Sequence, residues 1–162
     1  MVLANTRELI RQIAQVLERV ATLTDPKITI CVGDSKTPKG NAHVLVSNPQ
    51  WISNRCAGRD PINLDNLKLM VYDEADELFL QEGNHPFFLK IYNNIKKKNV
   101  EAQHVLFSAT FEPYVKDVIK KFFKQLTIYP LQKESLRLKG VRMLKMRLFE
   151  EEKPLLINLV YE

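Results

Sequence analysis

Apolar and polar positions follow two different periods along this chain, and the two periods predict helices and strands in turn. Helical spacing, with apolar residues three and four positions apart, runs from Leu9 to Val20 and recurs after Pro49, Pro86 and Pro113. Between these stretches lie short apolar runs typical of buried strands, at 28–32, 44–46, 67–72, 105–107 and 126–131. Strands that alternate with helices predict right-handed βαβ units, and therefore an α/β fold with a parallel sheet.

Composition narrows the class of protein only a little. A length of 162 residues allows one sizeable core, and 45% hydrophobic content is ordinary for a globular domain. The formal net charge of +5 permits contact with a polyanion but is far from that of a dedicated nucleic-acid tail. A membrane-spanning helix needs about 20 consecutive apolar residues, and no stretch of the chain approaches that length. We therefore expect a soluble intracellular protein. Cys31 and Cys56 have no metal or disulfide spacing and are expected to be buried free thiols.

Two of the expected strands end on side chains that can carry chemistry. The run at 67–72 leads into Asp73, Glu74 and Asp76, and the run at 105–107 leads into Ser108 and Thr110. Ligands of open α/β sheets bind at the carboxyl ends of the strands, where these acids suit a metal nucleotide. The acids alone have another interpretation, since carboxylates at the start of a helix offset its dipole. The hydroxyl pair on a second strand favours a catalytic site.

The two motifs, in this order and spacing, resemble motifs II and III of the DEAD-box RNA helicases. The segment Ala4 to Leu9 is similar to motif Ia, with Asn5 where proline is usual, and Pro49 lies in an altered motif Ib. The stretch 33–46 and Phe111 resemble the mRNA-export helicases of the nuclear pore, whereas the tail 133–162 is also similar to the translation-initiation helicases.

The resemblance implies a RecA-like parallel sheet with helices on both faces. Residues 1–132 would form a partial first helicase domain, and residues 133–162 the interdomain linker and the start of a second domain. It also implies ATP and Mg²⁺ as cofactors and RNA as a partner. The resemblance to the mRNA-export branch further implies export factors of the nuclear pore as partners. It also implies a location in the cytoplasm or nucleus, including the periphery of the nuclear pore.

For the acidic site, the resemblance implies a separate role for each residue. Asp73 would hold Mg²⁺, through water, and Glu74 would orient and deprotonate the attacking water. Both would therefore contact the cofactor. Asp76 would bond to Ser108 and Thr110, which links the phosphate site to motif III.

For RNA, the resemblance implies contacts to the sugar-phosphate backbone from Thr6, Arg7 and Gly33. Thr6 and Gly33 each have a second interpretation. Thr6 also suits the cap of the helix that follows, and both functions are compatible. Gly33 would let a backbone approach RNA closely, but it equally suits a plain turn after a strand.

Motif Ib is the weakest match. Asn48 and Pro49 would still contact RNA, but Gln50 brings a side chain to a position where the family has glycine. We therefore expect weak RNA binding. Trp51 could stack on a base, whereas a lone Trp at the start of a helix is more often part of a core or an interface.

A glycine-rich phosphate loop of the form GxxxxGK[ST] occurs nowhere in the chain. Matching order places it before Met1, so we expect a first domain without its opening part and without the strand that carries the phosphate loop. The strand at 105–107 would then lie at a sheet edge, and the chain alone would hydrolyse no ATP. A non-catalytic RecA-like module that binds RNA or protein is the rival hypothesis, and accidental chain boundaries are a third.

Overall fold

The computed structural model describes residues 1–24, 28–33, 42–56, 61–98, 101–123, 125–130, 146–147 and 149–150. Contacts divide the chain into two units, Met1–Leu126 and Thr127–Glu162. All helices and strands named below belong to the first unit. Expectations for the tail from 133 onward fall almost wholly outside the described residues.

Five strands form the sheet of the first unit, and they are parallel, as the sequence predicts. They are β1 (Val2–Leu3), β2 (Ile30–Gly33), β3 (Val44–Ser47), β4 (Leu69–Tyr72) and β5 (Gln103–Leu106). Their order is β2-β3-β1-β4-β5, so β5 pairs with β4 and lies at one edge of this sheet. The expected edge position of this strand is confirmed for the described residues.

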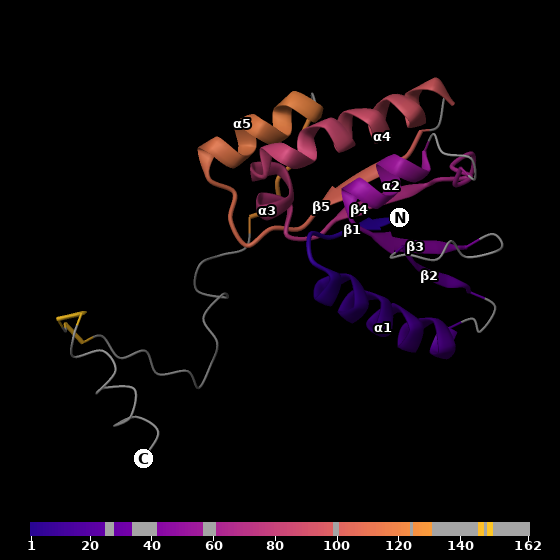
Figure 1. Ribbon diagram of the computed structural model, residues 1–162, viewed down its shortest axis with the longest axis horizontal. Helices are drawn as coiled ribbons and strands as arrows, with labels where there is room; N and C mark the ends of the chain where they lie inside the picture. The colour runs from indigo at the N-terminus through magenta and orange to yellow at the C-terminus, as the bar shows by residue number, and fades with distance from the viewer. Residues whose placement is uncertain are drawn as a thin grey trace, which may run out of the picture. The chain divides into compact units, whose positions relative to one another are not determined.

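Helices cover both faces of the sheet. Helix α1 (Arg7–Thr24) lies on one face, and α2 (Pro49–Arg55), α3 (Ala75–Leu80), α4 (His85–Lys97) and α5 (Pro113–Phe122) lie on the other (Figure 1). A short 3-10 turn, η1 (Glu82–Asn84), joins α3 to α4. Right-handed crossovers explain this division, because the chain moves across the sheet in one direction from β1 to β2 and in the opposite direction from β3 to β5. None of the helices in the described residues is long and apolar enough to span a bilayer.

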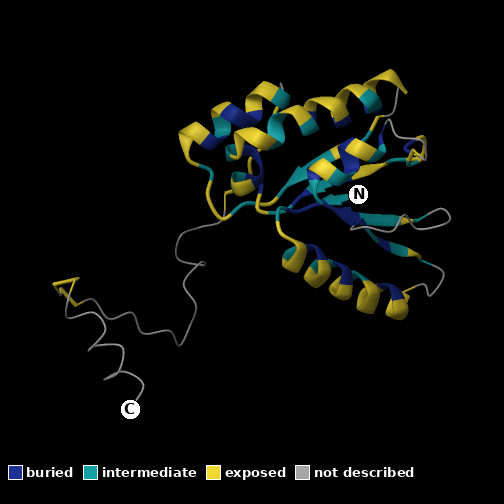
Figure 2. Ribbon diagram, viewed as in Figure 1, coloured by how far each residue is buried: buried dark blue, intermediate teal, exposed yellow. Residues whose placement is uncertain are grey.

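The larger core lies between the sheet and helices α2 to α5, where Figure 2 shows buried inner faces. Aromatic rings fill its centre: Phe79 and Phe88 stack with centroids 4.6 Å apart, and Tyr72 lies 5.4 Å from Phe79. A smaller core lies under α1. The two cysteines are buried free thiols, as expected, and burial raises the pKa of Cys56 to about 11.

The structure corrects the sequence prediction at three elements. The strand predicted at 126–131 is wrong for residues 126–130, which form no strand. A strand needs a neighbour that satisfies its backbone groups, and none of the described strands pairs with this segment. The sequence prediction also omitted β1 and gave the helix that becomes α3 only as an alternative interpretation of the acids, because these elements are too short, at 2 and 6 residues, to show a hydrophobic period.

Candidate functional site

All the predicted site residues lie along the edge of the sheet that is formed by the carboxyl ends of its strands. The strands are parallel, so their carboxyl ends meet at the same edge. In the order of the sheet, β2 ends at Gly33, Asn48 follows β3, Thr6 follows β1, Asp73 follows β4 and Ser108 follows β5. The residues expected to contact RNA therefore occupy one half of the edge, and those expected to contact the nucleotide occupy the other.

The acidic loop leaves β4 through a strained turn. Asp73 donates its backbone N–H to the Leu3 carbonyl at 2.9 Å, and its Oδ1 accepts from the N–H of Glu74 at 3.1 Å. Glu74 has a φ of 49°, a left-handed conformation that costs a non-glycine residue about 1 kcal/mol or more. The turn directs the chain into α3 and leaves the Glu74 side chain exposed to solvent.

The second loop is bonded directly to the first. Thr110 Oγ1 donates to Asp76 Oδ2 at 2.7 Å, and the Asp76 N–H donates to Ser108 Oγ at 3.3 Å. Ser108 in turn donates to the Thr110 carbonyl at 2.6 Å. The N–H of Ala75 donates to the Phe107 carbonyl at 2.8 Å, which ties the two backbones together. The structure thus joins the two motifs that the sequence placed 32 and 34 residues apart.

These bonds affect the charge of Asp76. Burial acts to raise its pKa, but the hydrogen bonds from Thr110 and Ser108, together with backbone N–H groups, outweigh it, so the pKa lies below its ordinary value. Asp76 is therefore ionised at neutral pH. It holds the second loop in place as an acceptor.

On the half of the edge that holds the residues expected to contact RNA, Thr6 caps α1. Its Oγ1 accepts from the backbone N–H of Leu9 at 3.2 Å, which satisfies one of the free donors of the first turn. Arg7, at the first position of the helix, is exposed. Both residues remain available to solvent at this end of α1.

Gly33 is required by packing, which the sequence did not reveal. A Cβ at this position would lie 2.6 Å from Ser47 Oγ and 2.7 Å from Trp51 Cε3, both shorter than real contacts allow. Ser47 Oγ also donates to the Gly33 carbonyl at 2.7 Å. The end of β2 is therefore pressed against the end of β3 and the start of α2.

The start of α2 is fixed by Asn48, whose Oδ1 accepts from the Trp51 N–H at 2.8 Å as a helix cap. Pro49 is buried at the first helical position, and Gln50 is exposed. Trp51 is half-buried and packs on the larger core, while the Arg55 guanidinium carbon lies 5.4 Å from its ring centroid. The core interpretation of Trp51 is the one that these contacts favour.

The carboxylates of the acidic loop suit a hydrated Mg²⁺ better than a metal ion coordinated wholly by protein side chains. Among the described residues, no cluster of three or more His, Cys, Asp or Glu side chains could hold an ion. Mg²⁺ keeps several waters and binds one or two carboxylates together with substrate phosphates. Asp73, partly exposed at the end of β4, offers one such carboxylate.

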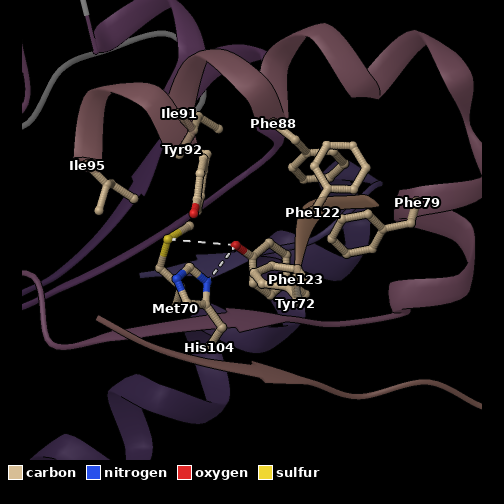
Figure 3. Close-up of a pocket in the computed structure, with 10 residues that line it drawn as sticks. All are labelled: Met70, Tyr72, Phe79, Phe88, Ile91, Tyr92, Ile95, His104, Phe122 and Phe123. Atoms are coloured by element: carbon tan, nitrogen blue, oxygen red, sulfur yellow. Dashed lines mark hydrogen bonds between the residues drawn. The ribbon is translucent and has the colours of Figure 1, made fainter. Parts of the chain in front are cut away.

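Sequence reasoning gave no role to His104, which forms a partly buried polar contact. Its Nδ1 lies 3.0 Å from the hydroxyl of Tyr72, which also approaches the Met70 sulfur (Figure 3). Burial holds the pKa of His104 below its ordinary value and raises that of Tyr72. The surrounding aromatic cavity, about 10 Å³, has room for one water at most and belongs to the core.

Comparison with known proteins defines the family. Residues 1–118 match the family described as DEAD/DEAH box helicase. The chain is 33% identical over 158 residues to the ATP-dependent RNA helicase eIF4A of Kluyveromyces lactis, which covers 94% of this chain and 39% of that protein. It is 34% identical over 147 residues to the ATP-dependent RNA helicase DBP5 of Lodderomyces elongisporus, which covers 89% of this chain and 28% of that protein. The chain therefore belongs to the DEAD/DEAH box helicase family.

Solved structures support the same assignment. The structure of S. cerevisiae Dbp5 bound to RNA and ADP BeF3 has a TM-score of 0.68 at 28% identity, and the match covers 87% of this chain and 36% of that one. Our chain thus has the RecA-like fold of a DEAD-box domain. It spans well under half the length of these relatives.

Proposed function

We propose that this chain is part of the first domain of an ATP-dependent RNA helicase of the DEAD-box class. Residues 1–132 supply that domain, and residues 133–162 the linker and the start of the second. The observation that carries the proposal is the bonded pair of loops, in which Thr110 and Ser108 hold Asp76 beside Asp73 and Glu74.

In this proposal the three acids divide the work of hydrolysis. Bound Mg-ATP supplies an activated phosphoryl group whose charge is offset by the metal. Asp73 would hold the hydrated metal through its carboxylate. Glu74, exposed and one residue further along the strained turn, accepts the proton of the attacking water. Asp76 serves as a positioning residue, because it transmits the arrangement of this loop to the loop after β5.

RNA binds along the other half of the sheet edge in this proposal. Arg7 and the free N–H groups at the start of α1 contact phosphate, and so do Thr6 and the start of α2. The Asn48 side-chain oxygen accepts the cap hydrogen bond, and its amide NH₂ is the donor that can contact phosphate. Gly33 contributes by bringing the β2 end against Trp51, which aligns this surface.

A role in mRNA export is the finer form of the proposal. It is supported by the DBP5 relatives and by solved structures of Dbp5 variants bound to Gle1 and to Nup159 at 30% identity or more. By this proposal, the protein that carries the chain works in the cytoplasm or at the nuclear pore with comparable partners.

We further propose that residues 1–162 alone hydrolyse no ATP, with or without RNA. The chain contains no glycine-rich loop with a lysine, so the β- and γ-phosphates lose their main donors. Loss of these donors should also abolish measurable nucleotide affinity, which calorimetric titration of the chain with Mg-ATP tests directly. No measurable heat of binding is expected, and micromolar affinity would refute it.

The rival proposal is a RecA-like module that binds RNA or protein and has no ATPase activity. It also predicts no measurable heat of Mg-ATP binding. The two separate when a phosphate-loop segment and a second domain from the Lodderomyces relative are joined to this chain. The helicase proposal expects RNA-stimulated ATP hydrolysis from the chimera, and the rival expects none.

A further inference from the structure

Helix α3, which begins in the acidic loop, is held at its far end by side chains of the segment that follows it. The helix has 6 residues and starts directly after Glu74. The last carbonyls of a helix have no N–H partner within it, and a left-handed residue commonly satisfies them. Gln81, which ends α3, is extended and not left-handed. The end of α3 therefore depends on donors from elsewhere in the chain.

Two side chains supply these donors. Asn84 Nδ2 donates to the Leu78 carbonyl at 3.1 Å, and His85 Nε2 lies 2.7 Å from the Phe79 carbonyl oxygen. A carbonyl oxygen can only accept, so Nε2 of His85 carries the proton of this bond. An imidazole can donate from Nε2 both as the neutral Nε2–H tautomer and as the cation. The contact therefore holds in either protonation state.

The same imidazole contacts α5. Its ring meets the ring of Phe122, the last residue of α5, edge to face with centroids 5.5 Å apart. Phe122 also lies 5.4 Å from the ring of Phe79, and Figure 3 shows these two rings side by side. His85 thus contacts the C-terminal ends of both α3 and α5.

These two helices lead back to the two bonded loops of the site. Asp76 lies about one helical turn before Phe79 on α3, and the loop of Ser108 and Thr110 leads directly into α5. At their N-terminal ends, the helices are joined by the bonds between Asp76 and this loop. At their C-terminal ends, they are joined through His85.

A helix as short as α3 moves as one body. Six residues span about 9 Å, so a tilt about the middle of the helix displaces both of its ends equally. The bond between Thr110 and Asp76 is 2.7 Å long, and O–H···O bonds extend only to about 3.0 Å. A small change at the His85 contact should therefore alter the bond at Asp76.

We propose that His85 is a positioning residue of the proposed hydrolytic site, because it fixes the C-terminal ends of α3 and α5 and thereby the bond between Asp76 and Thr110. For the hydrolytic role, the inference rests on the proposed function. For the way in which the site is held, it rests on the contacts described above. By this proposal His85 contacts neither nucleotide nor metal and acts only through the two helices.

Hydrogen exchange and NMR titration of the whole chain test the proposal without nucleotide. His85→Phe keeps an aromatic ring against Phe122 but removes the donor. The amides of Ala75 and Asp76, which donate to the second loop, should then exchange about tenfold faster relative to the amides of β4, whose exchange follows global unfolding. The pKa of Asp76 should also rise toward its ordinary value, because the bonds that lower it lengthen.

Two further variants separate positioning from a general loss of stability. His85→Gln places an amide donor near the lost Nε2, so it should restore slow exchange and the low pKa of Asp76. His43→Phe removes a different bond between a histidine and the backbone, in which Nδ1 accepts from the Thr29 N–H at 3.0 Å at the amino ends of β2 and β3. It should leave the pKa of Asp76 and the relative exchange of Ala75 and Asp76 unchanged.

The wild type supplies a measurement that needs no variant. Long-range proton–nitrogen NMR of the His85 ring should show a proton on Nε2. Three results would each overturn the proposal: a ring without that proton, wild-type exchange and Asp76 pKa in His85→Phe, or the same local changes in His43→Phe. Failure of His85→Gln to restore the site would overturn it as well. None of these results involves nucleotide, so they are distinct from an absence of ATP hydrolysis in the chimera, which would overturn the proposed function.

Discussion

At the scale of single residues, the contact of Asp76 with Ser108 and Thr110 was predictable from the sequence, because both motifs lie at strand ends, where parallel strands bring distant residues together. Asp76 and Thr110 are 34 residues apart yet form a 2.7 Å bond. The need for a glycine at position 33 could not be predicted in the same way. It depends on Trp51 and Ser47, which approach it only once the sheet has formed.

Thr110→Val tests the bond that joins the two loops. Loss of the hydroxyl donor should raise the pKa of Asp76 toward its ordinary value, because the ionised form loses its shortest side-chain hydrogen bond. Carboxyl chemical shifts in an NMR titration measure this. Thr22→Val, the same change on the exposed surface of α1, should leave Asp76 unchanged. An unchanged Asp76 in Thr110→Val would contradict the arrangement of the site.

His104 should make stability depend on pH. Its pKa is lower in the folded than in the unfolded chain, so the unfolded chain binds more protons below the ordinary value of about 6.5. Stability is therefore fully present above that value and should fall as the pH drops below it. Urea unfolding between pH 7.5 and pH 5.5 should show the decrease, and His104→Phe should reduce it. His43→Phe should retain it, and equal slopes in all three proteins would refute the role of His104.

At the scale of elements, the pattern of the sequence predicted the long helices and four of the five strands. It failed where an element depends on its neighbours. Strand β1 has 2 residues and exists because β3 and β4 flank it on both sides. Residues 126–130 have a strand-like composition but find no strand to pair with among the described ones.

Gly33→Ala tests the junction of β2, β3 and α2. The added methyl group overlaps Ser47 and Trp51, and such overpacking costs about 1–3 kcal/mol of unfolding free energy. Denaturant unfolding measures the loss, and the fluorescence of Trp51, the single Trp of the chain, should change with it. Gly83→Ala is the control, because a Cβ there meets nothing within 4 Å. Equal stability of the two variants would show that the junction is loose.

At the scale of the whole molecule, the order of strands places the residues proposed to contact RNA and those proposed to contact the nucleotide on separate halves of the sheet edge formed by the strands' carboxyl ends. The identity of these residues was accessible from the sequence through the resemblance of its motifs.

RNA binding by this edge should be weak, tolerant of sequence and steeply dependent on salt, since the expected contacts are to phosphates. Arg7→Ala should weaken binding to all sequences alike and lower the salt slope by about 1. Arg11→Ala, further along α1, should have little effect. Gln50→Gly should strengthen binding if that side chain obstructs the loop. Fluorescence anisotropy of labelled RNA measures all four proteins, and a salt-insensitive complex would contradict backbone recognition.

The most direct test of the proposed function is the ATPase rate of a complete helicase that contains this chain, measured with the wild type and with Glu74→Gln. Turnover in the presence of RNA should fall by about 10²–10⁴-fold in Glu74→Gln, because the base is lost, while Mg-ATP affinity stays nearly unchanged. Asp73→Ala, measured alongside, should instead weaken the Mg²⁺-dependent part of nucleotide binding. Equal turnover of the wild type and Glu74→Gln would contradict the assignment of this sheet edge as the hydrolytic site.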